Sequence, residues 1–219
     1  MVHEFPPRGF MDALLAAVLR ATLRLLLKPV FSPRFSIAFQ RRWLVGLARI
    51  ALPTRGVATE GGQVAGVTGE WCRRRTGGTR PGSILYLHGG AYCVGGPATH
   101  RALTTRLARV TGLPVFVADY RLPPEHPFPA ALDDALTAYR TLRADGPVIL
   151  AGDSAGGGLA LATALALREA GDPAPAALVL LSPWVDLVTP EPRPPAPPGE
   201  AMLDWAWIDA CARHYAGGG

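Results

Sequence analysis

Residues 148–157 read VILAGDSAGG and predict a strand that turns sharply into a helix. The apolar run Val148–Ala151 has the length of a buried strand, and a helix is expected over Ala155–Ala170. Between them lies the pattern G-x-S-x-G centred on Ser154. This pattern is typical of a serine exposed on a strand-to-helix turn, where small neighbours relieve crowding and the helix N-terminus stabilises negative charge. Ser154 is therefore a candidate nucleophile.

A second glycine-rich turn, HGGAY at residues 88–92, follows the apolar run Ile84–Leu87. Consecutive small residues allow backbone N–H groups to converge on one point, as they do in an oxyanion hole. Phosphate-binding loops have a similar composition. However, the chain lacks G-K-[ST], and no G-x-G-x-x-G follows the first of these strands. The turn therefore favours acyl transfer over nucleotide binding.

Strands and helices alternate from residue 54 onward. This alternation predicts an α/β fold in which a mostly parallel sheet is covered by helices on both faces. The expected strands are 84–87, 115–118, 148–151 and 178–181, and the expected helices are 99–110, 130–143, 155–170 and 202–215. Gly112 is expected to end the first of these helices, and the proline-rich segment 189–199 is expected to be a loop.

The N-terminal part, residues 1–53, is predicted to be a helical cap on a core formed by residues 54–219. Its expected helices are 12–28 and 35–52, and the first carries a basic stripe at Arg20, Arg24 and Lys28. Three interpretations stay open for this part. It could cover an apolar pocket, lie at a membrane interface, or form a plain helical hairpin packed on the core.

The charge of the chain is unevenly distributed. The net charge is +5 overall, but residues 1–80 hold thirteen Lys and Arg against four Asp and Glu. Such a balance suits anionic lipid or nucleic acid. Because no nucleic-acid-binding module is recognisable, we expect no nucleic-acid partner and only weak membrane-surface contact through the basic helices.

The three cysteines, Cys72, Cys93 and Cys211, match no zinc-binding spacing, so free thiols and no metal or organic cofactor are expected. No apolar run reaches the roughly 20 residues of a membrane span. Asp12 precedes the first apolar run and arginines follow it, whereas a signal peptide has its positive charges before the apolar run. A cytoplasmic location is therefore predicted.

Four segments together resemble a known family. They are HGGAY at 88–92, the segment 119–131 with the sequence DYRLPPEHPFPAA, GDSAGG at 152–157, and SPWVDL at 182–187. In order and spacing they resemble the hormone-sensitive-lipase-like branch of the α/β-hydrolases, which includes many bacterial carboxylesterases. The resemblance extends from about residue 83 to 216, and the helices before residue 54 match the cap of that branch in position.

The resemblance implies roles for individual residues. Ser154 would attack an ester carbonyl and form an acyl-enzyme. The oxyanion site would be built by His88, Gly89, Gly90, Ala91 and Ala155. Within it, the N–H groups of Gly90, Ala91 and Ala155 would hold the oxyanion, Gly89 would shape the turn and His88 would support the loop.

The acid and histidine that such an enzyme needs after its nucleophile are not evident. His214 is the one histidine that follows Ser154, and it lies in an expected helix, where a surface position is favoured. Asp186 and His126 are expected to be structural. The chain thus resembles the first two-thirds of an esterase, without the last strands of the core. An exposed apolar sheet edge is then expected to make the isolated chain unstable or prone to aggregate. A sharp, reversible melting transition of a monomer would contradict this.

The favoured function is a serine hydrolase of carboxylic esters with short or medium acyl chains, or of lactones; an amide would use the same groups. Tyr92, Phe128 and Trp184 are expected to contribute to the acyl pocket. Two alternatives stay open. The chain could be a catalytically inactive hydrolase-like binder of a lipid or acyl ligand, or a membrane-surface or partner-binding module.

Overall fold

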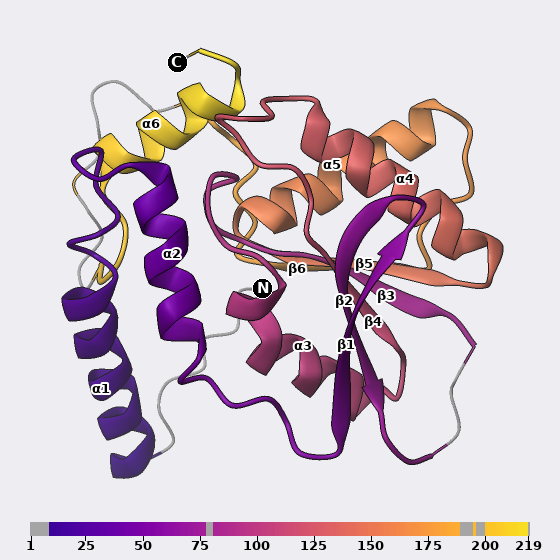
Figure 1. Cartoon of the computed structure of the whole chain (residues 1–219), viewed down its shortest axis with the longest axis horizontal. Coiled ribbons are helices and arrows are strands. Elements are labelled where there is room, and N and C mark those ends of the chain that lie inside the picture. Colours follow the sequence, from indigo (N-terminus) through magenta and orange to yellow (C-terminus); the bar gives the residue numbers. More distant parts are fainter. Residues whose placement is uncertain (1–8, 78–80, 189–194, 196–199, 219) are drawn as a thin grey trace.

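A computed structural model of the chain describes residues 9–77, 81–188, 195 and 200–218, which form a sheet flanked by helices (Figure 1). The helices are α1 (Phe10–Leu26), α2 (Ile37–Ala48), α3 (Pro97–Thr111), α4 (Ala130–Ala144), α5 (Ala155–Glu169) and α6 (Trp205–Tyr215). The strands are β1 (Val57–Val64), β2 (Val67–Arg74), β3 (Ser83–Leu87), β4 (Val115–Ala118), β5 (Val148–Asp153) and β6 (Ala177–Leu181).

The six strands are arranged in the order β1-β2-β4-β3-β5-β6. The four strands expected from the apolar runs are parallel to one another, which confirms the predicted fold class. The hairpin of β1 and β2 was not predicted, and it joins β4 in antiparallel fashion. Half of the residues of β1 are exposed, and this segment lacks the apolar run by which the other strands are recognised.

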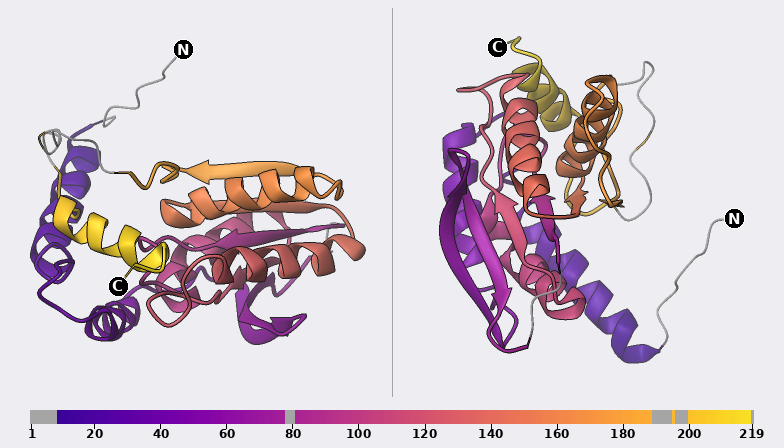
Figure 2. Two further views of the ribbon diagram at one scale, coloured as in Figure 1. Left: turned by 90° about the horizontal axis from the view of Figure 1, so that it is seen from above. Right: turned by 90° about the vertical axis from the view of Figure 1, so that its right-hand side faces the viewer.

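Helices cover both faces of the sheet, as predicted. On one face α3 packs on β2 and β4, and on the other α4 and α5 pack together against the parallel strands (Figures 1 and 2). Alternate residues of β3 point to the two sides, with Leu85 and Leu87 in one apolar cluster and Ile84 and Tyr86 in the other. Gly112 ends α3 in the left-handed conformation, as expected.

The cap helices lie at one end of the molecule (Figure 1). The C-terminal end of α1 meets α2, where Trp43 Nε1 donates to the carbonyl of Leu26 at 2.8 Å. α2 packs on α3. The connection between α1 and α2 packs on α6, because Phe31 stacks on Trp207 with ring centroids 4.4 Å apart. α6 therefore packs against the cap, although its residues belong to the segment 54–219 that was predicted to form the core. Among the described helices, none is both long and apolar enough to cross a bilayer.

β6 lies at the edge of the sheet, where it pairs with β5 and with no other described strand. Its side chains Leu178, Val179 and Leu181 are 41–42% exposed, although an apolar run of this kind is typical of a buried strand. Low solubility of the isolated chain stays a prediction, and this edge is the feature on which it rests.

Candidate active site

Ser154 is the single residue between the end of β5 and the start of α5. Its backbone is left-handed and strained, with φ 50° and ψ −120°. The turn is possible because Gly156 lies directly against the backbone carbonyl of Leu87, where a Cβ atom would collide. Gly156 thus lets α5 start close to the end of β3. As a result, Ser154 lies at the lining of a cavity.

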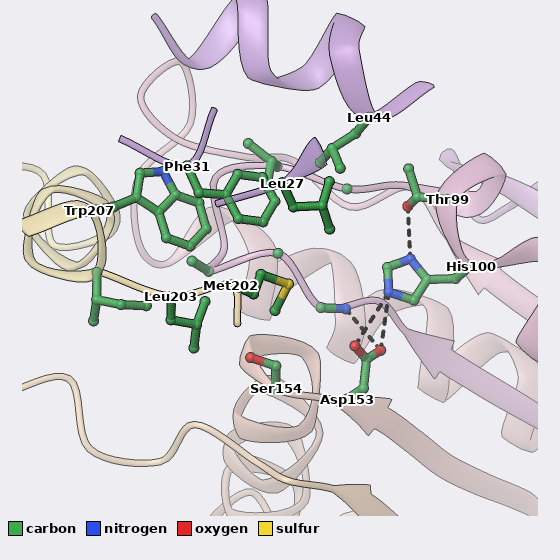
Figure 3. A pocket seen from close by; sticks show the side chains of 16 residues that line it. Leu27, Phe31, Leu44, Thr99, His100, Asp153, Ser154, Met202, Leu203 and Trp207 are labelled. Atoms are coloured by element: carbon green, nitrogen blue, oxygen red, sulfur yellow. Dashed lines mark hydrogen bonds and ion pairs between the residues drawn. The ribbon is translucent and has the colours of Figure 1, made fainter. Parts of the chain in front are cut away.

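Asp153 connects the serine turn to the loop after β3 (Figure 3). Its Oδ1 accepts hydrogen bonds from the Tyr86 hydroxyl at 2.7 Å and from the Gly89 N–H at 3.0 Å. His100 Nε2 lies 3.3 Å from its carboxylate, and His100 Nδ1 lies 2.8 Å from Thr99 Oγ1. Burial alone would raise the pKa of Asp153. The hydrogen bond and charge of His100, helped by Tyr86 and Gly89, outweigh burial and hold this pKa below its ordinary value. Asp153 is therefore an ionised anchor for the loop.

The loop after β3 leaves backbone donors unused. The Gly89 N–H is engaged by Asp153, whereas the N–H groups of Gly90 and Ala91 donate no hydrogen bond to any described residue. The loop turns back on itself because Cys93 and Val94 both donate to the carbonyl of Gly90. The N–H of Ala155, at the first position of α5, is likewise without an acceptor in the described chain. Free donors of this kind are suited to an anionic oxygen.

His88 is fully buried beneath this loop. Its ring stacks on Tyr120 with centroids 4.3 Å apart, and its Nδ1 lies 2.9 Å from the carbonyl oxygen of Gly89. The Tyr120 hydroxyl donates to the carbonyl of His88 at 2.6 Å. Burial, reinforced by His100, lowers the pKa of His88 to about 3, so the ring is neutral. These contacts support the loop and provide no proton acceptor at Ser154.

A cavity of about 240 Å³ opens beside Ser154 (Figure 3). Its floor includes Gly90 and Ala91, and its walls are apolar side chains from the cap and from the region of α6. These wall residues are Leu27, Phe31, Leu44, Met202, Leu203, Trp207 and Ile208. The Trp207 Nε1 donates to the buried Gln40 Oε1 at 2.8 Å, which fixes the aromatic wall to α2. The arrangement suits a small apolar group held against the serine.

The comparisons with known proteins agree with this geometry. The sequence profile described as alpha/beta hydrolase fold matches residues 84–219, which is more than half of the chain. The chain belongs to the α/β-hydrolase family. Within it, the chain falls in the hormone-sensitive-lipase-like carboxylesterase branch, as the similar proteins below indicate.

The most informative similar proteins are hydrolases. The chain is 46% identical to an acetyl-hydrolase of Streptomyces hygroscopicus over 69% of its own length and 52% of that protein. It is 38% identical to an esterase of Acinetobacter venetianus, over 70% of this chain and 52% of that protein. An esterase structure from the bacterial hormone-sensitive lipase family matches 99% of this chain and 71% of that one, with TM-score 0.79 and 35% identity. The chain therefore spans about half the length of these two curated relatives.

The prediction that three aromatic residues contribute to the acyl pocket of this α/β-hydrolase is wrong. Tyr92, Phe128 and Trp184 are not among the residues that line the cavity. Tyr92 has a left-handed backbone, with φ 61°, and its side chain is buried in the core, stacked on Tyr215 at 3.9 Å. Phe128 meets Tyr215 edge-on, and Trp184 packs beside Tyr92. The aromatic residues that line the cavity come instead from the cap and from α6. From the sequence, the apolar cap was expected to contribute to the pocket, but without named residues.

No histidine of the described α/β-hydrolase chain hydrogen-bonds to Ser154 Oγ. His100 lines the same cavity as Ser154 but is engaged by Asp153 and Thr99. His214 lies on α6 outside the cavity lining, and its Nδ1 is buried without a partner. His126 is exposed.

Two further groups singled out from the sequence lie apart from the cavity. Asp186 is exposed, and its carboxylate accepts from the N–H of Val188 at 2.9 Å. Cys72, Cys93 and Cys211 are buried free thiols, as predicted. Across the described ranges, no group of three His, Cys, Asp or Glu side chains could hold a metal ion.

Proposed function

We propose that the protein is a carboxylic-ester hydrolase in which Ser154 is the nucleophile. The observation that carries this proposal is the juxtaposition, at one cavity, of a strained serine turn with the unengaged N–H groups of Gly90 and Ala91. The family and the named esterases among its members support it.

In the proposed reaction, Ser154 Oγ attacks the ester carbonyl carbon and loses its proton to a base. The carbonyl oxygen becomes an oxyanion, which Gly90, Ala91 and Ala155 would stabilise through their N–H groups. Each such donor contributes about 3 kcal/mol to acyl transfer. When this intermediate collapses, the protonated base gives its proton to the leaving oxygen, the alcohol departs and Ser154 stays acylated. Attack by water then releases the acid and restores the Ser154 hydroxyl.

The proposal assigns no residue to the base or to its acid partner. The attack needs a proton acceptor within hydrogen-bonding reach of Ser154 Oγ. No histidine among residues 9–77, 81–188 and 200–218 makes that contact. In this proposal the chain's own residues would provide the nucleophile, the oxyanion donors and the acyl pocket.

The cavity favours small apolar substrates. Its volume of about 240 Å³ and its walls of leucine, methionine and aromatic side chains suit short or medium acyl chains, or a lactone. The name of the acetyl-hydrolase relative is in keeping with a short acyl group.

We also propose a cytoplasmic location.

Replacing Ser154 with alanine tests the proposal. With p-nitrophenyl butyrate as substrate, we expect hydrolysis by the wild-type chain and a fall to the uncatalysed rate in Ser154→Ala, because alanine has no nucleophilic oxygen. Thr141→Ala is the matched control, since it removes an exposed hydroxyl on α4 that donates to the carbonyl of Thr137 within the same helix. Equal rates for Ser154→Ala and wild type would contradict a role for this serine.

A second candidate function is binding without turnover. Within the described chain no histidine hydrogen-bonds to Ser154 Oγ. This favours binding without turnover, because a hydroxyl without a base is a poor nucleophile. Silence of both wild type and Ser154→Ala toward the ester, with equal binding of a fluorescent fatty acid, would select this alternative over hydrolysis by this chain.

A further inference from the structure

α1 presents an apolar face that no other part of the described chain covers. None of its seventeen residues is buried. Phe10, Leu14, Val18 and Leu25 fall on one side of the helix by their spacing, and they are 79%, 44%, 54% and 74% exposed. A contiguous exposed apolar face of this kind marks an interaction surface.

Positive charge borders this apolar face. Arg20 and Arg24, four residues apart, follow it along one flank of α1 and lie within 4.0 Å of no described carboxylate. Residues 9–53 hold one acidic residue, Asp12, and seven basic ones: Arg20, Arg24, Lys28, Arg34, Arg41, Arg42 and Arg49. An apolar face flanked by arginine is the pattern of a helix that lies in the interface of an anionic membrane.

An apolar hollow links this helix to the candidate active site. It has a volume of about 370 Å³ and lies between α1 and α2, among side chains such as Leu23, Leu26 and Leu47. Leu27, Leu44 and Thr99 line both this hollow and the cavity beside Ser154. The hollow and the cavity therefore adjoin at these three residues.

We propose that α1 and α2 dock the protein on the surface of an anionic lipid bilayer, with the apolar face of α1 in the interfacial region. Charge favours this occupant over a second copy of the chain, because two copies would oppose basic helices of the same sign. If Ser154 acts as proposed above, the hollow would admit an acyl chain from the bilayer toward it. The docking itself does not depend on that activity.

Flotation with vesicles tests the docking without any substrate. We expect the full chain to float with phosphatidylcholine–phosphatidylglycerol vesicles, to float far less with phosphatidylcholine alone, and to be released by high salt. Arg20→Gln/Arg24→Gln should weaken binding to the anionic vesicles by about ten-fold or more. Arg75→Gln/Arg168→Gln, which removes two exposed charges outside the cap, is the matched control and should bind as wild type does.

The apolar face is tested separately by Leu14→Glu/Val18→Glu, which should also abolish flotation. Both side chains are exposed, so the far-UV circular dichroism of this variant should match that of wild type. Equal flotation of wild type and both cap variants would overturn the proposal. A concentration-dependent dimer that α1 variants disrupt, with no vesicle binding, would overturn it in favour of a second copy. Neither result depends on the outcome of the Ser154→Ala assay.

Discussion

Gly156→Ala is expected to destabilise the protein by about 3 kcal/mol, at the upper end of the cost of overpacking. The added Cβ would collide with the backbone carbonyls of Leu87 and His88. Both belong to the end of β3 and the start of the glycine-rich loop, so neither can move without disturbing the sheet and the donors beside Ser154. Urea denaturation followed by tryptophan fluorescence, on the monomeric fraction from gel filtration, measures the change.

Gly46→Ala is the matched control for this substitution. Gly46 lies inside α2, and a Cβ atom there meets nothing within 4 Å. Alanine at this position should therefore stabilise the protein by about 0.5–1 kcal/mol through its helix propensity. If Gly156→Ala leaves the urea midpoint unchanged, the close approach of α5 to β3 described above is wrong.

The parallel core and the turns of the site could be predicted because their signals are local. The strand runs 84–87, 115–118, 148–151 and 178–181 each end at glycine or at a polar residue, and the G-x-S-x-G turn follows one of them directly. The β1–β2 hairpin has no such signal, because Glu60, Gly61 and Gly62 interrupt its apolar pattern. Whether an apolar run is central or at an edge, as in β6, depends on strand order and cannot be read locally.

The lining of the cavity could not be predicted residue by residue. Its aromatic wall depends on contacts between distant parts of the chain, such as Trp207 with Gln40, 167 residues apart. The prediction that Tyr92 lines the pocket is wrong for a different reason. Its backbone has a positive φ, which the residue type disfavours, so the direction of its side chain could not be predicted from the usual conformation. The side chain lies in the core and not in the pocket.

The stability of the protein is expected to fall steeply as the pH is lowered from 6.5, because of His88. In the folded state burial lowers the pKa of this histidine to about 3, whereas an exposed histidine has a pKa of about 6.5. Between these values the unfolded chain binds a proton that the folded protein does not. The stabilisation is thus complete above pH 6.5 and is lost as the pH falls toward 3.

The free energy of unfolding should fall by up to about 1.4 kcal/mol per pH unit below pH 6.5, and by about 2 kcal/mol between pH 6.5 and 4.5. Asp153, whose pKa is lowered, also favours folding at higher pH, but its contribution is lost only below the ordinary pKa of an aspartate, about 3.9. Urea denaturation of the monomeric fraction at the two pH values measures the change. Equal stability at pH 6.5 and 4.5 would show that His88 is protonated in the folded protein.

Two variants assign the effect to His88. His88→Phe preserves a ring that can stack on Tyr120 and removes the titrating group, so its stability should change little over the same range. His126→Gln removes an exposed histidine and should retain the wild-type slope. Should the phenylalanine variant not fold, the NMR resonance of the His88 Cε1 proton in wild type provides a second measurement. This resonance should not shift above pH 4, because burial keeps the His88 ring neutral in that range.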